Sequence, residues 1–165
     1  MKVVLQRVSN ACVRADGETA GSCGKGLMML VGVSTGDAEA DAEALARKIL
    51  NLRIFTDENG KMNLSVKDIG GEALVISNFT LMADYRHGNR PDFMASARPD
   101  EAKRLYEYFT SLIARELSHV GTGRFGAHMD ITMCADGPVT IVLDSSILLK
   151  KQPLPPEISE KRRSE

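Results

Sequence analysis

The order of hydrophobic and polar positions near the start of the chain predicts β-structure. Val3 to Arg14 alternates well enough for one or two strands, and Asp16-Gly17 is a strong hairpin signal. The continuous apolar run Leu27–Val33 is typical of a strand that is buried on both faces. We therefore expect the first part of the chain, as far as Val33, to consist of strands.

Two later segments have apolar residues at the spacing of an amphipathic helix. The first opens at Gly36-Asp37, carries acidic residues in its first turns and should end near residues 51–53. The second begins at Pro99, which suits the first turn of a helix, and should be stopped by Gly121. The apolar faces consist of Ala38, Ala42, Leu45, Ala46, Ile49 and Leu52 in the first helix, and of Ala102, Leu105, Tyr106, Phe109, Leu112, Ile113 and Leu117 in the second.

Short strands are expected between and after the helices. Arg53–Thr56 predicts a short strand, residues 57–60 a turn, and Ala73–Ser77 a further strand. His128–Cys134 and Val139–Asp144 are predicted to be the final strands. This order of elements indicates an α/β fold, in which a mixed, barrel-like sheet is covered by the two amphipathic helices.

Length and composition fit one compact domain. With 165 residues, of which 43% are apolar, the chain can bury a core without disulfides or a metal. We assign residues 1–147 to this domain, and we expect the charged, proline-containing segment 148–165 to be a disordered tail. Ile131 and Met133 alternate at the strand period and are assigned to the core. Residues 82–97 form a long polar loop, for which a functional role is expected.

The charge balance does not indicate a protein coated in positive potential. Lysine and arginine total 21 against 22 acidic residues, so a nucleic-acid partner would need a local basic patch. The candidates are Arg86, His87 and Arg90 in the long loop, with help from Lys25 and Arg98. The plainer interpretation is a solvated loop.

The cysteines and histidines give no sign of a disulfide or a metal. Cys12, Cys23 and Cys134 lack C-x-x-C spacing and lie in or beside apolar segments, which predicts reduced, buried thiols and a cytosolic protein. No signal peptide and no apolar window of membrane length is found. The three histidines are not spaced as zinc ligands, so no metal or other cofactor is expected.

A glycine-proline step lies between the last two apolar segments, within Ala135–Thr140. Pro138 has a fixed φ and no N–H, so it cannot donate to a sheet ladder and its carbonyl direction is set locally. The plain interpretation is a hairpin turn between the two final strands. The other interpretation is functional, because such a step presents two carbonyls as a rigid and chemically inert sensor.

A second motif, Ser77-Asn78-Phe79-Thr80-Leu81, places hydroxyls and an aromatic ring at a strand end, where sites are often built. The two motifs together resemble the paired SQFTL and NxGPVT signatures of the D-aminoacyl-tRNA deacylase family, in order and in spacing. The resemblance extends from Met1 to about Asp144. It includes Leu5-Gln6-Arg7-Val8, Gly60-Lys61-Met62-Asn63-Leu64, Gly88-Asn89-Arg90-Pro91 and Thr122-Gly123-Arg124-Phe125-Gly126-Ala127.

Two positions depart from the family pattern. Asn78 stands where the family commonly has glutamine, and Ala135 where it commonly has asparagine. Asn78 keeps a side-chain amide but loses one methylene of reach, whereas Ala135 cannot form side-chain hydrogen bonds. We expect the activity to survive, because Gly137, Pro138 and Thr80 match the family signatures.

The resemblance implies hydrolysis of the ester that joins a D-amino acid to the 3′-terminal adenosine of tRNA, as chiral proofreading in translation. Glycyl-tRNA mischarged on tRNA(Ala) is an implied substrate as well, because glycine has no side chain to exclude. The implied partner is the acceptor end of aminoacylated tRNA. The implied assembly is a cytoplasmic homodimer with its active site at the interface and no contact with a membrane.

The resemblance also implies roles for single residues. The Gly137-Pro138 step is implied to be cis and to enter the partner subunit's pocket, where its carbonyls exclude an L side chain, and Arg7 is implied to hold that loop. The catalytic candidates are Ser77, Asn78, Phe79 and Thr80, and the candidates for contacts with tRNA and adenosine are Arg86, Arg90, Phe125 and Met129.

The chemistry at the strand end has alternatives. Thr80 and Ser77 are possible nucleophiles, but no adjacent base is recognisable in the sequence. The preferred mechanism has main-chain N–H groups at Phe79 and Thr80 holding the oxyanion, with water attacking and the vicinal ribose hydroxyl assisting. Other functions stay open: an RNA-binding module without catalysis, an esterase or peptidase using Thr80 or Ser77 on small substrates, and a deacylase with altered stereochemical preference.

Overall fold

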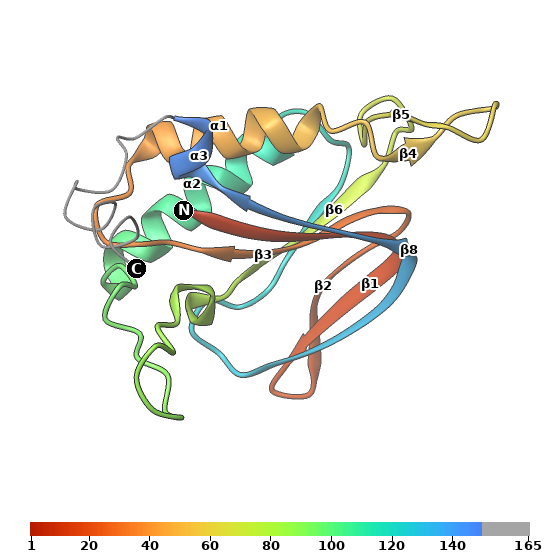
Figure 1. The fold of residues 1–165 in the computed structure, drawn as a ribbon. Helices are drawn as coiled ribbons and strands as arrows, with labels where there is room; N and C mark the ends of the chain where they lie inside the picture. Colours follow the sequence, from red (N-terminus) through yellow and green to blue (C-terminus); the bar gives the residue numbers. More distant parts are fainter. Residues whose placement is uncertain (150–165) are drawn as a thin grey trace.

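The computed structural model describes residues 1–149, and Figure 1 shows how their helices and strands are arranged. The elements are β1 (Lys2–Ala15), β2 (Glu18–Cys23), β3 (Gly26–Gly32), α1 (Glu39–Leu50), β4 (Phe55–Thr56), β5 (Met62–Leu64), β6 (Glu72–Ser77), the 3₁₀ turn η1 (Phe79–Met82), α2 (Pro99–Ala114), β7 (Val120–Thr122), β8 (Met129–Asp144) and α3 (Ser145–Leu148). Residues 150–165, most of the predicted tail, lie outside the described residues, whereas Leu148 belongs to α3 and packs against the core.

One mixed sheet organises the molecule. Its strands run in the order β2-β1-β3-β6-β7, and β8 pairs with β1. The pairs β3–β6 and β6–β7 are parallel, and the pairs that involve β1 are antiparallel. The helices α1 and α2 lie side by side on one face of this sheet (Figure 1). The predicted α/β class and the barrel-like mixed sheet are confirmed.

The sheet separates two apolar cores. Leu27, Met29 and Val31 of β3 belong to the core between the sheet and the helices, whereas Met28 belongs to the core inside the curved sheet. Successive side chains of a strand point to opposite faces, so a strand with a core on each side must be apolar throughout. The continuous apolar run that predicted a doubly buried strand therefore has its physical cause in these two cores.

Two glycines allow the sheet to curl almost into a closed barrel, with β2 at one end of its order and β7 at the other. A Cβ atom on Gly21 would lie 2.4 Å from the carbonyl oxygen of Thr122, and one on Gly121 would lie 2.3 Å from that of Ser22. Any larger residue would push the two backbones apart. His119 adds a contact across the same gap, because its Nε2 lies 2.9 Å from the carbonyl oxygen of Ser22.

Helix α2 ends earlier than the sequence indicates. It stops at Ala114, although Leu117 is still buried beyond its end. Gly121 does not stop the helix, because it lies inside β7, where the close approach to β2 requires it. The pattern of residues does not predict β5, β7, η1 or α3, all of four residues or fewer. Elements this short carry no periodic signal, so tertiary contacts decide them.

The last two predicted strands form one strand, β8, and the hairpin interpretation of Gly137-Pro138 is therefore wrong. Both halves of β8 pair with β1 in the same antiparallel direction, and the register shifts around Val8 absorb the irregular step. The expected burial on β8 is wrong as well. Ile131 and Met133 are each 38% exposed, and Cys134 is exposed, because β8 pairs only with β1 among the described residues.

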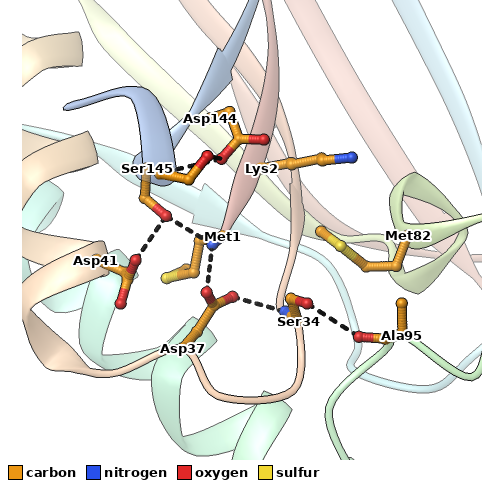
Figure 2. Close-up of a pocket in the computed structure, with 10 residues that line it drawn as sticks. Met1, Lys2, Ser34, Asp37, Asp41, Met82, Ala95, Asp144 and Ser145 are labelled. Atoms are coloured by element: carbon orange, nitrogen blue, oxygen red, sulfur yellow. Dashed lines mark hydrogen bonds and ion pairs between the residues drawn. The ribbon is translucent and has the colours of Figure 1, made fainter. Parts of the chain in front are cut away.

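A polar cluster joins the start of β1 to α1 and α3. The α-ammonium group of Met1 lies 2.7 Å from a carboxylate oxygen of Asp37 and donates to the Ser145 hydroxyl, also at 2.7 Å. The Ser145 hydroxyl donates to Asp41 in the first turn of α1. Figure 2 shows these side chains converging on a small hollow of about 240 Å³. Because its polar groups bond to one another, this cluster is structural.

Candidate functional site

The Ser77–Thr80 motif lies where β6 ends and the chain turns sharply into η1. The N–H of Asn78 donates to the carbonyl of Val31 at 2.8 Å. This bond continues the parallel pairing of β3 and β6 to the end of β6. The side-chain oxygen of Asn78 then accepts from the N–H of Thr80 at 3.1 Å and from the Thr80 hydroxyl. Asparagine favours this capping geometry because its short amide reaches the backbone two residues on.

The aromatic ring of the motif stands at the surface. Phe79 is 57% exposed, and its ring meets Phe93 of the long loop edge to face, with centroids 5.1 Å apart. The Ser96 hydroxyl donates to the Phe79 carbonyl at 3.2 Å. The loop is held further by two isolated antiparallel β-bridges, Ser34–Ser96 and Asp84–Asp92. The long polar loop of residues 82–97 is thus a support for the strand end.

A cavity of about 650 Å³ opens beside this strand end. Most of its lining is apolar, and it unites residues from β3, β6, η1, α2, the segment before β8 and the start of β8. The predicted site residues that line it are Ser77, Asn78, Phe79, Thr80, Phe125 and Met129. It has the mixed character of a small-molecule site, with an apolar body and a few polar groups at one end.

Polar groups at the cavity do not form a nucleophile–base pair. His128 was not among the predicted site residues, although it lines the cavity. Its side chain is 92% exposed, and its Nε2 lies 3.9 Å from Asp130. That separation exceeds hydrogen-bonding distance, and no described hydrogen bond joins His128 to Thr80 or Ser77. The Thr80 hydroxyl instead donates to Asn78, an amide that cannot act as a base.

The backbone around η1 offers one hydrogen-bond donor to a ligand. The N–H of Thr80 is taken by Asn78, and that of Leu81 donates to the Asn78 carbonyl at 3.4 Å. Within the part of the chain that the structure describes, the N–H of Phe79 has no protein acceptor. A single N–H at the rim of an apolar cavity can bind a carbonyl or oxyanion strongly, because water competes less there.

The Gly137-Pro138 peptide bond is cis, and both residues are exposed on β8. Arg7, which is almost fully buried, lies beneath them: its Nε donates to the Asp136 carbonyl at 3.1 Å, and its Nη1 to the Ile54 carbonyl at 2.6 Å. An ion pair between Arg7 and the Asp136 carboxylate adds to this hold. Neither Gly137 nor Pro138 lines the cavity of its own chain.

The two loop arginines stand apart from the cavity as well. Arg86 is bound to the Asp84 carboxylate through its Nε at 2.9 Å, and the guanidinium holds the pKa of that carboxyl far below its usual range. Arg90 is exposed and forms no ion pair among the described residues. The structure therefore does not bring Arg86 or Arg90 to the predicted catalytic residues.

Three further findings concern metal binding, membrane spans and the Cys23 thiol. Within residues 1–149, no group of histidine, cysteine and acidic side chains is placed so that it could hold a metal ion. The same part of the chain contains no helix that is long and apolar enough to cross a membrane. Burial raises the pKa of Cys23 to about 11, so that this thiol is protonated and unreactive at neutral pH.

The fold and the cavity define a class: an α/β protein with a curled mixed sheet and a ligand site at a strand end. Comparison with known families narrows this class. The family model described as D-Tyr-tRNA(Tyr) deacylase matches residues 4–144, and the chain belongs to this family.

Relatives from several bacteria agree with this assignment. A D-aminoacyl-tRNA deacylase of Dehalococcoides mccartyi is 57% identical over 145 residues, which are 88% of this chain and 95% of the relative. A protein of the same name from Halalkalibacterium halodurans is 54% identical over 88% of this chain and 99% of its own length.

Two solved structures share the fold. One, described as a c-Myc DNA unwinding element binding protein, superposes with a TM-score of 0.82 at 39% identity and covers 87% of this chain and 98% of its own. Another, described as a probable eukaryotic D-amino acid tRNA deacylase, has a TM-score of 0.73 at 16% identity, with the same coverage of both chains. At that identity the second likeness concerns the fold alone.

Proposed function

We propose that the protein hydrolyses the ester bond of D-aminoacyl-tRNA and releases the D-amino acid and free tRNA. The observation that carries this function is the apolar cavity at the β6 end, where the Phe79 N–H has no protein acceptor among the described residues. The names of the bacterial relatives support the same activity.

In the proposed reaction, the ester carbonyl accepts a hydrogen bond from the Phe79 N–H while a water molecule attacks its carbon. The ester C–O bond then breaks, the ribose oxygen leaves with a proton, and the vicinal ribose hydroxyl assists the proton transfer. Phe125 and Met129 line the cavity and offer the terminal adenine an apolar surface on which to stack. Thr80 orders the turn through its bonds to Asn78.

The chirality filter is proposed to act between subunits of a homodimer. Gly137 and Pro138 are exposed and absent from the cavity of their own chain, so a filter made of their carbonyls requires a second copy. The free edge of β8 supports such pairing, because a long exposed edge strand is normally covered. An L side chain would meet the carbonyls, whereas glycine and D-residues would not, so glycyl-tRNA is a proposed substrate as well.

The proposed partner is the acceptor end of aminoacylated tRNA, and the proposed location is the cytoplasm, where aminoacyl-tRNA is used. Arg86 and Arg90 are proposed to contact the RNA outside the cavity, where both are exposed. A binding module without catalysis is the second candidate, because no nucleophile–base pair lines the cavity in the described structure and one solved relative is named for DNA binding.

The first experiment is to follow hydrolysis of D-tyrosyl-tRNA and L-tyrosyl-tRNA by the purified protein. We expect rapid loss of the D ester and slow loss of the L ester. Loss of neither would favour the binding module, and equal loss of both would indicate an esterase without a chiral filter. The same assay on free D-tyrosine methyl ester separates the RNA-dependent enzyme from a small-ester esterase, which would hydrolyse both substrates.

Variants test the two parts of the site separately. Pro138→Ala is expected to raise the rate on L-tyrosyl-tRNA by roughly tenfold or more and to change the D rate little, because the carbonyls lose their fixed direction. Thr80→Ala is expected to lower the D rate only modestly, by the roughly tenfold effect of one lost hydrogen bond. A loss above about a thousandfold in Thr80→Ala would instead indicate a nucleophile. Full chiral selectivity in Pro138→Ala would contradict the sensor role.

A further inference from the structure

A basic hollow of about 510 Å³ is lined by residues of α1, of the segment that follows α1, and of α3. It is lined by Ala44, Arg47, Lys48, Asn51, Leu52, Arg53 and Leu148. Three of these side chains are cationic and none is a carboxylate. The surface of a chain with nearly balanced total charge thus contains a local concentration of positive charge.

The cations of the basic hollow form no close ion pairs within the described chain, although Arg53 lies near enough to Asp57 and Asp68 to help lower the pKa of both carboxyl groups. Some other surface cations are paired, as in Arg104 with Glu39 at 2.7 Å and Lys67 with Glu116 at 3.3 Å. Neither Arg47, Lys48 nor Arg53 forms an ion pair among residues 1–149. Arg47 and Lys48 are neighbouring cations that repel each other, and a polyanion relieves that repulsion.

Arg53 is also held in a fixed orientation. Its Nε donates to the Asn63 carbonyl at 2.8 Å, and its Nη2 donates to the Asn63 side chain at 3.0 Å. These bonds leave the Nη1 donors without a protein acceptor in the described structure. An ordered guanidinium with free donors suits a phosphate group, because little side-chain entropy is lost when the phosphate binds.

The basic hollow is connected to the Gly137-Pro138 step by direct contacts. Arg53 precedes Ile54, whose carbonyl accepts from Arg7, and Arg7 also donates to Asp136 beside Gly137. In the proposed dimer, this step enters the partner's cavity. Arg53, at one end of the basic hollow, is thus one residue away from the contacts that hold this step.

We propose that the basic hollow binds the phosphodiester backbone of the tRNA whose 3′ end occupies the partner's cavity. This inference rests on the proposed function and adds a second RNA contact, in trans. Arg47 and Lys48 neutralise the backbone as mobile charges, and Arg53 fixes one phosphate through its guanidinium. The ester group itself is not touched, so the hollow contributes to substrate binding and not to the chemical step.

The test compares two substrates of the full-length protein. The double variant Arg47→Glu/Lys48→Glu is assayed on D-tyrosyl-tRNA and on 3′-O-D-tyrosyl-adenosine, which lacks the tRNA body. We expect KM for the tRNA to rise about tenfold or more with kcat unchanged, and no change on the adenosine ester. The slope of log Kd against log salt for tRNA should fall by about two, for two lost phosphate contacts.

Arg115→Glu is the matched control, since Arg115 is an exposed cation at the C-terminal end of α2 and does not line the hollow. An unchanged KM in the double variant, or an equal rise in Arg115→Glu, would overturn the proposed RNA contact. Wild-type protein that hydrolyses neither substrate would instead reject the proposed function. Should the charge reversal impair folding, Arg47→Gln/Lys48→Gln supplies the same comparison, with a smaller expected rise in KM.

Discussion

At the residue scale, Arg7 shows how one buried side chain organises two distant segments. Its guanidinium bonds to the carbonyls of Ile54 and Asp136, which lie 47 and 129 residues away in the sequence, and it also lies 6.0 Å from the centre of the Phe55 ring. A planar fork with several donors satisfies both carbonyls at once, whereas the single ammonium group of lysine cannot.

Arg7→Lys is therefore expected to destabilise the protein by about 1–3 kcal/mol, because at least one buried carbonyl loses its donor. The chiral selectivity should fall together with the stability, since the Gly137-Pro138 step loses its support. Urea unfolding and the ratio of D to L hydrolysis measure the two effects. Arg14→Lys, an exposed arginine that bonds to the Gly17 carbonyl, is the control and should change neither quantity.

Asn78 is the second residue with a sharp prediction. Its side chain accepts the N–H of Thr80, which leaves the N–H of Phe79 as the proposed donor to the oxyanion. Asn78→Gln is expected to raise kcat by about fivefold, the size of one modest hydrogen bond, because the longer amide fits the cap less well and releases the Thr80 N–H. Asn78→Asp should keep the cap and lower kcat by about tenfold or more through charge repulsion. A higher kcat in Asn78→Asp than in Asn78→Gln would contradict this assignment.

At the element scale, the contact between β2 and β7 depends on residues without a side chain. Gly121→Ala is expected to cost about 1–3 kcal/mol of unfolding free energy, because its Cβ would clash with the Ser22 backbone. Denaturant unfolding measures this cost. Gly17→Ser is the control at an open turn position: no neighbouring atom meets its Cβ, but its φ of +80° gives a smaller cost. A larger loss in Gly17→Ser would show that β2 and β7 do not need their close approach.

Helix α2 is attached to the sheet by a buried phenol. The Tyr106 hydroxyl donates to the Val75 carbonyl of β6 at 2.8 Å, and burial raises the pKa of Tyr106 to about 12 from its ordinary value of 10.0. The folded state thus keeps a proton that the unfolded state loses between these values. The associated stability is complete below pH 10 and is lost as the pH rises towards 12.

Stability should therefore fall between pH 10 and 12 in the wild type, and less steeply in Tyr106→Phe. Thermal unfolding over this range, with tyrosine ionisation followed by ultraviolet absorbance, provides the measurement. At neutral pH the phenylalanine variant should lose about 1 kcal/mol, the value of one hydrogen bond. Equal pH slopes in the two proteins would exclude this role for Tyr106.

At the scale of the whole molecule, the proposed site consists of two parts that one chain does not bring together. The cavity contains Phe79, Phe125 and Met129, while the glycine-proline step stands exposed on β8. A filter that acts in trans makes a specific prediction for mixed dimers. Pro138→Ala protein is mixed with an excess of Ala127→Trp protein, whose cavity is filled but whose step is intact.

In mixed dimers of the proposed arrangement, the open cavity of the Pro138→Ala chain would receive an intact step from the other chain. Hydrolysis of L-tyrosyl-tRNA should therefore fall on mixing, while D hydrolysis persists. A filter that acts within one chain would leave L hydrolysis unchanged. Light scattering of the wild type should give the mass of two chains, and a monomer that is active and selective would also contradict the arrangement in trans.

The sequence alone determined what depends on local pattern. Helical periodicity gave the positions of α1 and α2, the apolar run gave the doubly buried β3, and two short motifs gave the family. These features are readable because each is encoded in residues that are close together in the chain. The motifs also pointed to Ser77–Thr80, which the structure places at the cavity.

Only the tertiary structure decided the features that arise between distant segments. The pairing with β1 along its whole length makes β8 a single strand. Ile131 and Met133 are half-exposed on this strand, and the alternation of apolar residues could not predict this, because it does not reveal whether a face of the sheet is covered. The contacts of Arg7 and the basic hollow on α1 likewise join segments far apart in sequence. Such contacts depend on how the chain packs, and no local pattern of residues encodes them.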